Sequence, residues 1–241
     1  MRWITTAAAV LGIDEGSALR LVWFLLITAG CLLTAGLFCR TSAVITWLLH
    51  LCLAKSGGFN AYGVDSVMTI GLFYLMLAPL PDRASLDARL TVIKPSDPSL
   101  LGFFRRVLQV HLCLIYFFGG LTKLLGSGWW NGASVWRALT RPPFDHVSPE
   151  LLVHWRALLP SLGISVWAIE LLYVVFIWPR RTRMFWLSLV VTLHLGVAFA
   201  MGLYLFSLVL IILNLAAFAP ALKWERVRAR KTDAPAGAVA P

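Results

Sequence analysis

The sequence predicts an all-α fold: a polytopic integral membrane helical bundle of about seven transmembrane helices, with a Trp-rich interfacial loop between spans four and five. Composition is the first indication, since 59% of the 241 residues are hydrophobic and only 13% are charged, whereas a soluble domain usually contains about 25% charged residues. Apolar runs of roughly 20 residues, the length of a membrane-spanning helix, are the second. This composition excludes an ordinary soluble enzyme, a disordered chain and a small disulfide scaffold.

The placement of charge is the third indication. The chain has 21 Lys and Arg against 11 Asp and Glu, a formal net charge of +10. The basic residues form short clusters between apolar runs, as at 180–183 and 223–231, which is typical of the positive-inside bias of membrane proteins. We therefore expect the lipid bilayer as a partner and no nucleic acid. The four cysteines lie within apolar runs without a Cys-x-x-Cys pair, and no metal is predicted.

Seven apolar runs are expected to cross the membrane, with six or eight crossings as alternatives. They are residues 19–38, 42–57, 64–80, 106–125, 161–178, 184–201 and 203–219. The second and third runs are short, and each ends at a turn signal, Ser56-Gly57-Gly58 and Pro79-Leu80-Pro81. The last two would form one run too long for a single crossing. We therefore expect a tight reversal at Met201-Gly202-Leu203.

The chain is expected to divide into three regions. Residues 1–18 form an N-terminal segment, 19–222 the transmembrane domain, and 223–241 a tail that is basic and then Ala/Pro-rich and disordered. With seven spans the richest basic clusters all fall on one side, which should be cytoplasmic. We therefore expect a protein of the cell inner (plasma) membrane. Its C-terminus is then on the cytoplasmic side, and its N-terminus and the 126–160 loop are on the outer side. That loop is rich in Trp, which favours the headgroup region, and its run Ala133 to Thr140 is expected to form an interfacial helix.

Lys123 lies near the outer end of the fourth span. A lysine at a helix end can extend to the lipid headgroups, which is one interpretation. A site inside the bundle is the other, because Tyr116 lies seven residues earlier on the same helix face. The pair Gly119-Gly120 also allows a neighbouring helix, or a ligand, to approach the backbone closely.

Glu170 lies midway along the fifth span, where a carboxylate cannot reach either membrane surface. It must be protonated, paired or facing a wet cavity. His194 lies at a comparable depth in the sixth span, so the topology allows the two to pair. Such a pair is either structural or catalytic.

Further polar and aromatic residues are expected at the outer membrane face beside Lys123. Asn60 and Asp65 precede and begin the third span, and Trp129, Trp130 and Asn131 follow the fourth. Turn formation by Asn60 and helix capping by Asp65 are the simplest interpretations. A substrate pocket that includes them, with Gly119 and Gly120, is the alternative.

Two motifs suggest a family: Tyr-x-x-Gly-Gly-x-x-Lys at 116–123 and Trp-Trp-Asn-Gly at 129–132. With Glu170 and His194 they resemble the horizontally transferred transmembrane (HTTM) domain, the membrane part of vitamin K-dependent gamma-carboxylases. The likeness runs from about residue 20 to residue 220. Bacteria carry many stand-alone relatives, so the resemblance implies a multi-pass protein of a bacterial inner membrane.

In those carboxylases the lysine of the motif is the base that starts the reaction of reduced vitamin K with oxygen. The resemblance therefore implies that Lys123 is a base, that Tyr116, Glu170 and His194 position it or relay protons, and that the cofactor is a reduced, vitamin K-like quinone. The sequence departs from the carboxylase pattern in having no histidine beside Asn60 and Val197 in place of an asparagine. Carboxylation of protein glutamate is not expected, because only 21 residues follow residue 220, where the carboxylases have a large lumenal domain.

Two functions are consistent with these observations. One is a quinol- and oxygen-dependent membrane oxidoreductase or modifying enzyme. The other is a non-enzymatic membrane subunit of a bacterial peptide maturation, export or immunity system, which would bind a small membrane or secreted protein. A transporter is less expected, since the sequence contains neither an internal repeat nor paired broken helices.

Overall fold

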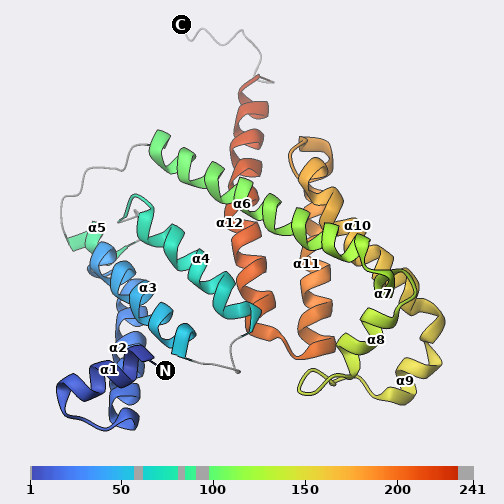
Figure 1. Cartoon of the computed structure of the whole chain (residues 1–241). Helices are drawn as coiled ribbons and strands as arrows, with labels where there is room; N and C mark the ends of the chain where they lie inside the picture. The colour runs from blue at the N-terminus through green and yellow to red at the C-terminus, as the bar shows by residue number, and fades with distance from the viewer. Residues whose placement is uncertain (1, 57–61, 81–84, 91–97, 233–241) are drawn as a thin grey trace, which may run out of the picture. The chain divides into compact units, whose positions relative to one another are not determined.

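The computed structural model describes residues 2–56, 62–80, 85–90 and 98–232, and most of these residues are helical, with no strand among them (Figure 1). They form two compact units, residues 1–105 and 106–241, and the boundary falls within helix α6. The predicted all-α class is confirmed.

Five complete helices lie in the described part of the first unit. They are α1 (Arg2–Leu11), α2 (Glu15–Ala35), α3 (Cys39–Ser56), α4 (Gly63–Leu77) and α5 (Leu86–Leu90). Helix α3 packs against both α2 and α4, and α1 lies on α2 and α3, as the blue and cyan helices of Figure 1 show. Asp14 begins α2 as its N-cap, with the Ser17 backbone N–H donating to its carboxylate at 2.8 Å.

The short turn between α2 and α3 is held by Asp87 of α5. Its two carboxylate oxygens accept the backbone N–H groups of Phe38, at 3.0 Å, and Cys39, at 2.8 Å. Gly36 ends α2 in the left-handed region with φ 74°, and its carbonyl accepts the Asp87 N–H at 2.9 Å. The hydrogen bonds from Cys39 and then Phe38 lower the pKa of the Asp87 carboxyl. Asp87 thus satisfies N–H groups that the start of α3 leaves without a helical partner.

The second unit contains the rest of α6 and seven further helical segments. They are α6 (Pro98–Leu125), α7 (Ser127–Trp130), α8 (Ala133–Thr140), α9 (Pro149–His154), η2 (Arg156–Leu158), α10 (Leu159–Phe176), α11 (Arg180–Met201) and α12 (Tyr204–Thr232). Helix α8 has the bounds expected from the sequence, and its position at the membrane interface stays a prediction. Helix α12 continues through the basic part of the predicted tail, whereas residues 233–241 lie outside the described residues.

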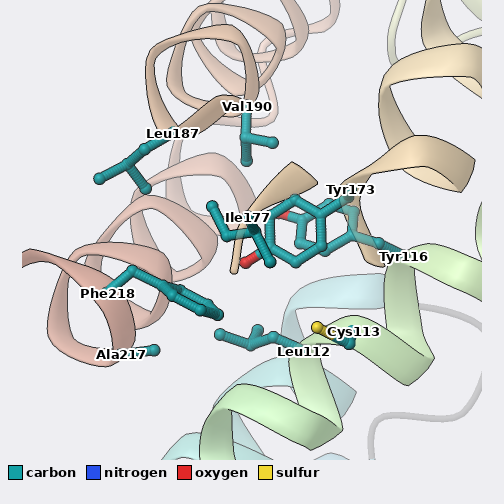
Figure 2. Close-up of a cluster of buried hydrophobic side chains, with 9 residues drawn as sticks. All are labelled: Leu112, Cys113, Tyr116, Tyr173, Ile177, Leu187, Val190, Ala217 and Phe218. Carbon is teal, nitrogen blue, oxygen red and sulfur yellow. The ribbon is translucent and has the colours of Figure 1, made fainter. Parts of the chain in front are cut away.

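Buried apolar side chains of α6, α10, α11 and α12 form the core of this unit (Figure 2). They are Leu112, Cys113, Tyr116, Tyr173, Ile177, Leu187, Val190, Ala217 and Phe218. The rings of Tyr116 and Tyr173 lie against each other, with centroids 4.4 Å apart. Two of the predicted site helices, α6 and α10, therefore meet in this core.

Four helical stretches among the described residues are long and apolar enough to cross a membrane: Glu15–Ala35, Ser99–Leu125, Arg156–Phe176 and Arg180–Met201. Large apolar side chains on them face outward, such as Phe24 at 67% exposure and Phe199 at 70%, as expected for lipid contact. Two shorter apolar helices, Gly63–Leu77 and Tyr204–Ala219, coincide with predicted spans. The protein is therefore a helical membrane protein with four candidate spans.

Two sequence features have the expected local structure. Gly202 separates α11 from α12 with φ 67°, and the two helices pack against each other, so the tight reversal is confirmed. Within the basic cluster 180–183, Arg183 is buried and its guanidinium donates to the carbonyls of Ile177, at 3.2 Å, and Trp178, at 2.6 Å. This arginine caps the end of α10 in addition to contributing positive charge.

The Asp87 contact predicts an acid-sensitive stability. A carboxyl whose pKa is lowered by folding stabilises the folded state above its unfolded pKa of about 3.9, and this contribution is lost as pH falls through the folded pKa. We expect D87A to lower the thermal unfolding temperature at pH 7, as measured by circular dichroism in detergent. The difference in unfolding temperature between D87A and the wild type should become smaller as the pH is lowered toward 3. An equal difference in unfolding temperature at pH 7 and at pH 3 would contradict the stabilising role of the Asp87 carboxylate.

Candidate functional site

An ion pair between Lys123 and Glu170 is the centre of the candidate site. The Lys123 Nζ of α6 lies 2.5 Å from Glu170 Oε2 of α10, and the two side chains are 22% and 13% exposed. Nζ also donates to the Gly119 carbonyl at 3.4 Å. Lys123 therefore turns toward α10 and a carboxylate. Glu170 acquires the partner that a carboxylate halfway along a membrane helix requires.

Two glycines of α6 make room for this pair. A Cβ on Gly120 would lie 2.6 Å from the Leu171 backbone nitrogen and 2.9 Å from its Cα, so the α6 and α10 backbones touch here. A Cβ on Gly119 would lie 3.1 Å from Glu170 Oε2 and 3.6 Å from Lys123 Nζ. Gly120 thus admits the neighbouring helix, and Gly119 admits the ion pair.

The tryptophans that follow α6 cover the site. Lys123 Nζ lies 5.4 Å from the centroid of the Trp129 ring, within the range of a cation–π contact. Trp130 packs on Trp167 of α10 with centroids 5.0 Å apart, and its indole N–H donates to the Leu124 carbonyl at 2.7 Å. Gly163 of α10 fits directly against the Trp129 carbonyl, where no Cβ has room. These contacts fix the aromatic residues next to the ion pair.

A second polar group is buried between α6, α10, α11 and α12. Tyr116 Oη lies 2.7 Å from His194 Nε2 and accepts the Asn214 side-chain N–H at 2.8 Å. Tyr173 donates its hydroxyl to Asn214 Oδ1 at 2.7 Å. The exposed fractions of these four residues range from 0% to 5%. The result is a continuous chain of hydrogen bonds inside the apolar core.

The structure does not pair Glu170 with His194, a contact that the expected topology allowed without requiring it. Glu170 pairs with Lys123, and His194 contacts Tyr116 through Nε2 while its Nδ1 has no partner in the described part of the chain. The reason is the close approach of α6 and α10 at Gly120, which brings Lys123 to Glu170. Tyr116, which contacts His194, and Lys123 lie seven residues apart on one face of α6. The four predicted catalytic residues thus lie in two adjoining groups, and their catalytic roles stay predictions.

The predicted pocket residues have different local roles. Asn131 Oδ1 accepts the Ala133 N–H at 3.0 Å, at the start of α8, and Asp65 Oδ2 accepts the Tyr62 N–H at 3.0 Å, at the start of α4. Each side chain therefore satisfies a backbone N–H group at a helix start. Asp65 belongs to the first unit, and Asn60 lies outside the described residues.

Three residues that complete the two groups were not among the predicted site residues. Tyr173 and Asn214 complete the buried hydrogen-bond chain, and Trp167 packs against Trp130 with its indole N–H buried and unpaired within the described structure. Tyr173 lies three residues after Glu170, and Trp167 three before, so spacing on one helix face was the available signal. Among the described residues no cluster of His, Cys, Asp or Glu could hold a metal ion.

The contact at Gly120 predicts a loss of stability on adding one methyl group. G120A should lower the free energy of unfolding by about 1–3 kcal/mol, the usual cost of overpacking, in a denaturant titration of the protein in detergent. G196A is the matched control, because a Cβ on Gly196 of α11 meets no atom within 4 Å. Equal stability of both variants would contradict the close contact of α6 and α10.

Comparison with known proteins supports one assignment. No curated protein and no solved structure matches the chain. A family model, the HTTM domain, matches residues 8–222. The match covers most of the chain, including both motifs and every residue of the two polar groups, and the protein belongs to the HTTM domain family.

Proposed function

We propose that the protein is a quinol- and oxygen-dependent membrane enzyme in which Lys123 is the base and Glu170 its proton-exchange partner. The ion pair of Lys123 and Glu170 carries this proposal. The carboxylate, which is only 13% exposed, lies on a helix long and apolar enough to span the membrane. Buried ionic pairs are costly to maintain, and a structural contact alone could be made by apolar residues of similar size.

The pair can generate a neutral amine without leaving an isolated charge. Transfer of one proton from Lys123 Nζ to Glu170 Oε2 leaves both groups uncharged, a state that surroundings of low polarity favour. The neutral amine then has a lone pair and can accept a proton from an acidic hydroxyl. Glu170 holds the transferred proton until the amine returns to its charged form.

The surroundings of the pair suit a flat, apolar molecule that carries oxygen atoms. The buried indole N–H of Trp167 and the buried Nδ1 of His194 have no hydrogen-bond partner among the described residues, and the rings of Trp129 and Trp130 lie beside the site. A reduced quinone, when bound, would supply the acidic hydroxyl and the electrons for reaction with oxygen. Because quinones dissolve in the bilayer, such a ligand would have direct access from the lipid.

Substitution of Lys123 by arginine tests this role sharply. Arginine keeps the positive charge beside Glu170 but does not give up its proton. K123R should therefore fold normally and oxidise a reduced naphthoquinone about 10²–10⁴-fold more slowly than the wild type, the usual contribution of a general base. Absorbance of the oxidised quinone is the readout, and K55R, at the exposed Lys55 of α3, is the control. Full activity of K123R would exclude Lys123 as the base. Co-purification of a small partner protein with K123R as well as with the wild type would favour the function as a membrane subunit.

We further propose the seven-span arrangement in the cell inner membrane, with the N-terminus outside and the C-terminus cytoplasmic. It is supported by the positions of α3, α4 and α12, which coincide with the three expected spans beyond the four long apolar stretches. The basic residues at 180–183 and 223–231 then share the cytoplasmic side.

Cysteine labelling tests this orientation. In intact cells a membrane-impermeant maleimide should label D145C, in the outer loop, and should label R181C only after the membrane is permeabilised. The wild type is labelled in parallel, because the native Cys31 is exposed on α2. Labelling of R181C but not of D145C in intact cells would reverse the orientation.

A further inference from the structure

The buried hydrogen-bond chain has a fixed direction, which begins at Asn214. Its side-chain nitrogen donates to the Leu210 carbonyl at 2.8 Å, and a carbonyl only accepts, so this contact fixes which end of the amide is the nitrogen. The amide oxygen therefore faces Tyr173, whose hydroxyl donates to it at 2.7 Å. The second N–H of Asn214 donates to Tyr116 Oη at 2.8 Å.

This direction determines the protonation of His194. Tyr116 Oη already accepts the Asn214 N–H, and its own proton points to His194 Nε2 at 2.7 Å. Nε2 must then offer a lone pair, and a neutral imidazole carries its proton on the other nitrogen, Nδ1. With the proton on Nε2 instead, Tyr116 would accept two N–H groups and its hydroxyl proton would have no acceptor in the described core.

The resulting Nδ1–H group has no acceptor in the described part of the protein, although His194 is only 5% exposed. Buried donors are almost always paired in folded proteins, and an unpaired one calls for an explanation. A similar N–H group belongs to Trp167 of α10, three residues before Glu170. Two unpaired donors thus accompany the Lys123–Glu170 pair.

We propose that Tyr173, Asn214 and Tyr116 are positioning residues that hold His194 neutral with its proton on Nδ1, and that this N–H donates to a carbonyl oxygen of the quinone. The quinone identity rests on the proposed function, whereas the position of the proton does not. An uncharged oxygen acceptor fits because the charges of Lys123 and Glu170 balance and the imidazole is neutral. An anionic ligand would add an unbalanced charge within the membrane.

The position of the proton can be measured directly without ligand. The full-length protein, labelled with ¹⁵N-histidine and reconstituted in lipid nanodiscs, should show a protonated Nδ1 and an unprotonated Nε2 for His194 at neutral pH. The H194F variant identifies the signals among those of the five histidines. A protonated Nε2, alone or together with a protonated Nδ1, would overturn the proposal.

Variants of the hydrogen-bond chain test its control over the proton. N214L removes the N–H that Tyr116 Oη accepts, and Y116F removes the hydroxyl that donates to Nε2, so each should give a mixture of the two imidazole tautomers. The control is S207A, because Ser207 of α12 is buried and its hydroxyl makes no hydrogen bond among the described residues. If both N214L and Y116F keep the proton on Nδ1, the positioning role is wrong.

A short-tailed, oxidised naphthoquinone then serves as the probe for the ligand. Its addition should shift the His194 Nδ1–H signal, and H194F should raise its Kd about tenfold, the loss expected for one hydrogen bond. Quenching of Trp fluorescence measures binding independently. Binding without a shift of Nδ1–H would overturn the ligand contact and leave the proposed function in place. If the naphthoquinone does not bind the wild type, both the proposed function and the ligand contact are contradicted. The position of the proton is decided separately, by the spectrum of the ligand-free protein.

Discussion

A charged group at membrane depth needs a partner, and this constraint governs the second unit of the protein, residues 106–241. Glu170 lies within a helix long and apolar enough to span the membrane, its side chain is only 13% exposed, and Lys123 supplies the opposite charge. The contact is possible because Gly120 lets the α6 and α10 backbones touch. The tryptophan segment after α6 then lies over the pair, with Trp129 at cation–π distance from the amine. Helix packing, charge balance and the position of the aromatic residues therefore depend on one another.

Much of the fold followed from apolar run length and turn residues. The reversal at Gly202 and the bounds of α8 agree with the sequence prediction, and every expected span coincides with a helix. The number of membrane crossings was harder to predict from the sequence. Helix α4 has only 15 residues, and α3 carries Arg40 and Lys55 near its two ends, so length and composition alone identify four spans among the described residues.

The site was predictable only in part, for physical reasons. The depth of Glu170 in its helix indicated that it needs a partner. Whether that partner is Lys123 or His194 depends on how α6 and α10 are rotated against each other. Residue spacing within one helix does not reveal that rotation. The Asn131 side chain accepts a backbone N–H at the start of α8, a role that sequence alone could not separate from ligand contact. Asn214 is a single polar residue in an apolar run, so no spacing indicated that it joins Tyr116 to Tyr173.

A double-mutant cycle on Lys123 and Glu170 tests the ion pair most directly. The free energy of unfolding is measured for K123M, E170L and the double variant in the same lipid and detergent mixture. Each single variant strands one buried charge, and should lose about 3–5 kcal/mol, whereas the double variant removes both charges and should lose far less than the sum. Additive losses, within about 0.5 kcal/mol, would mean that the two groups do not interact and would contradict the account of the site.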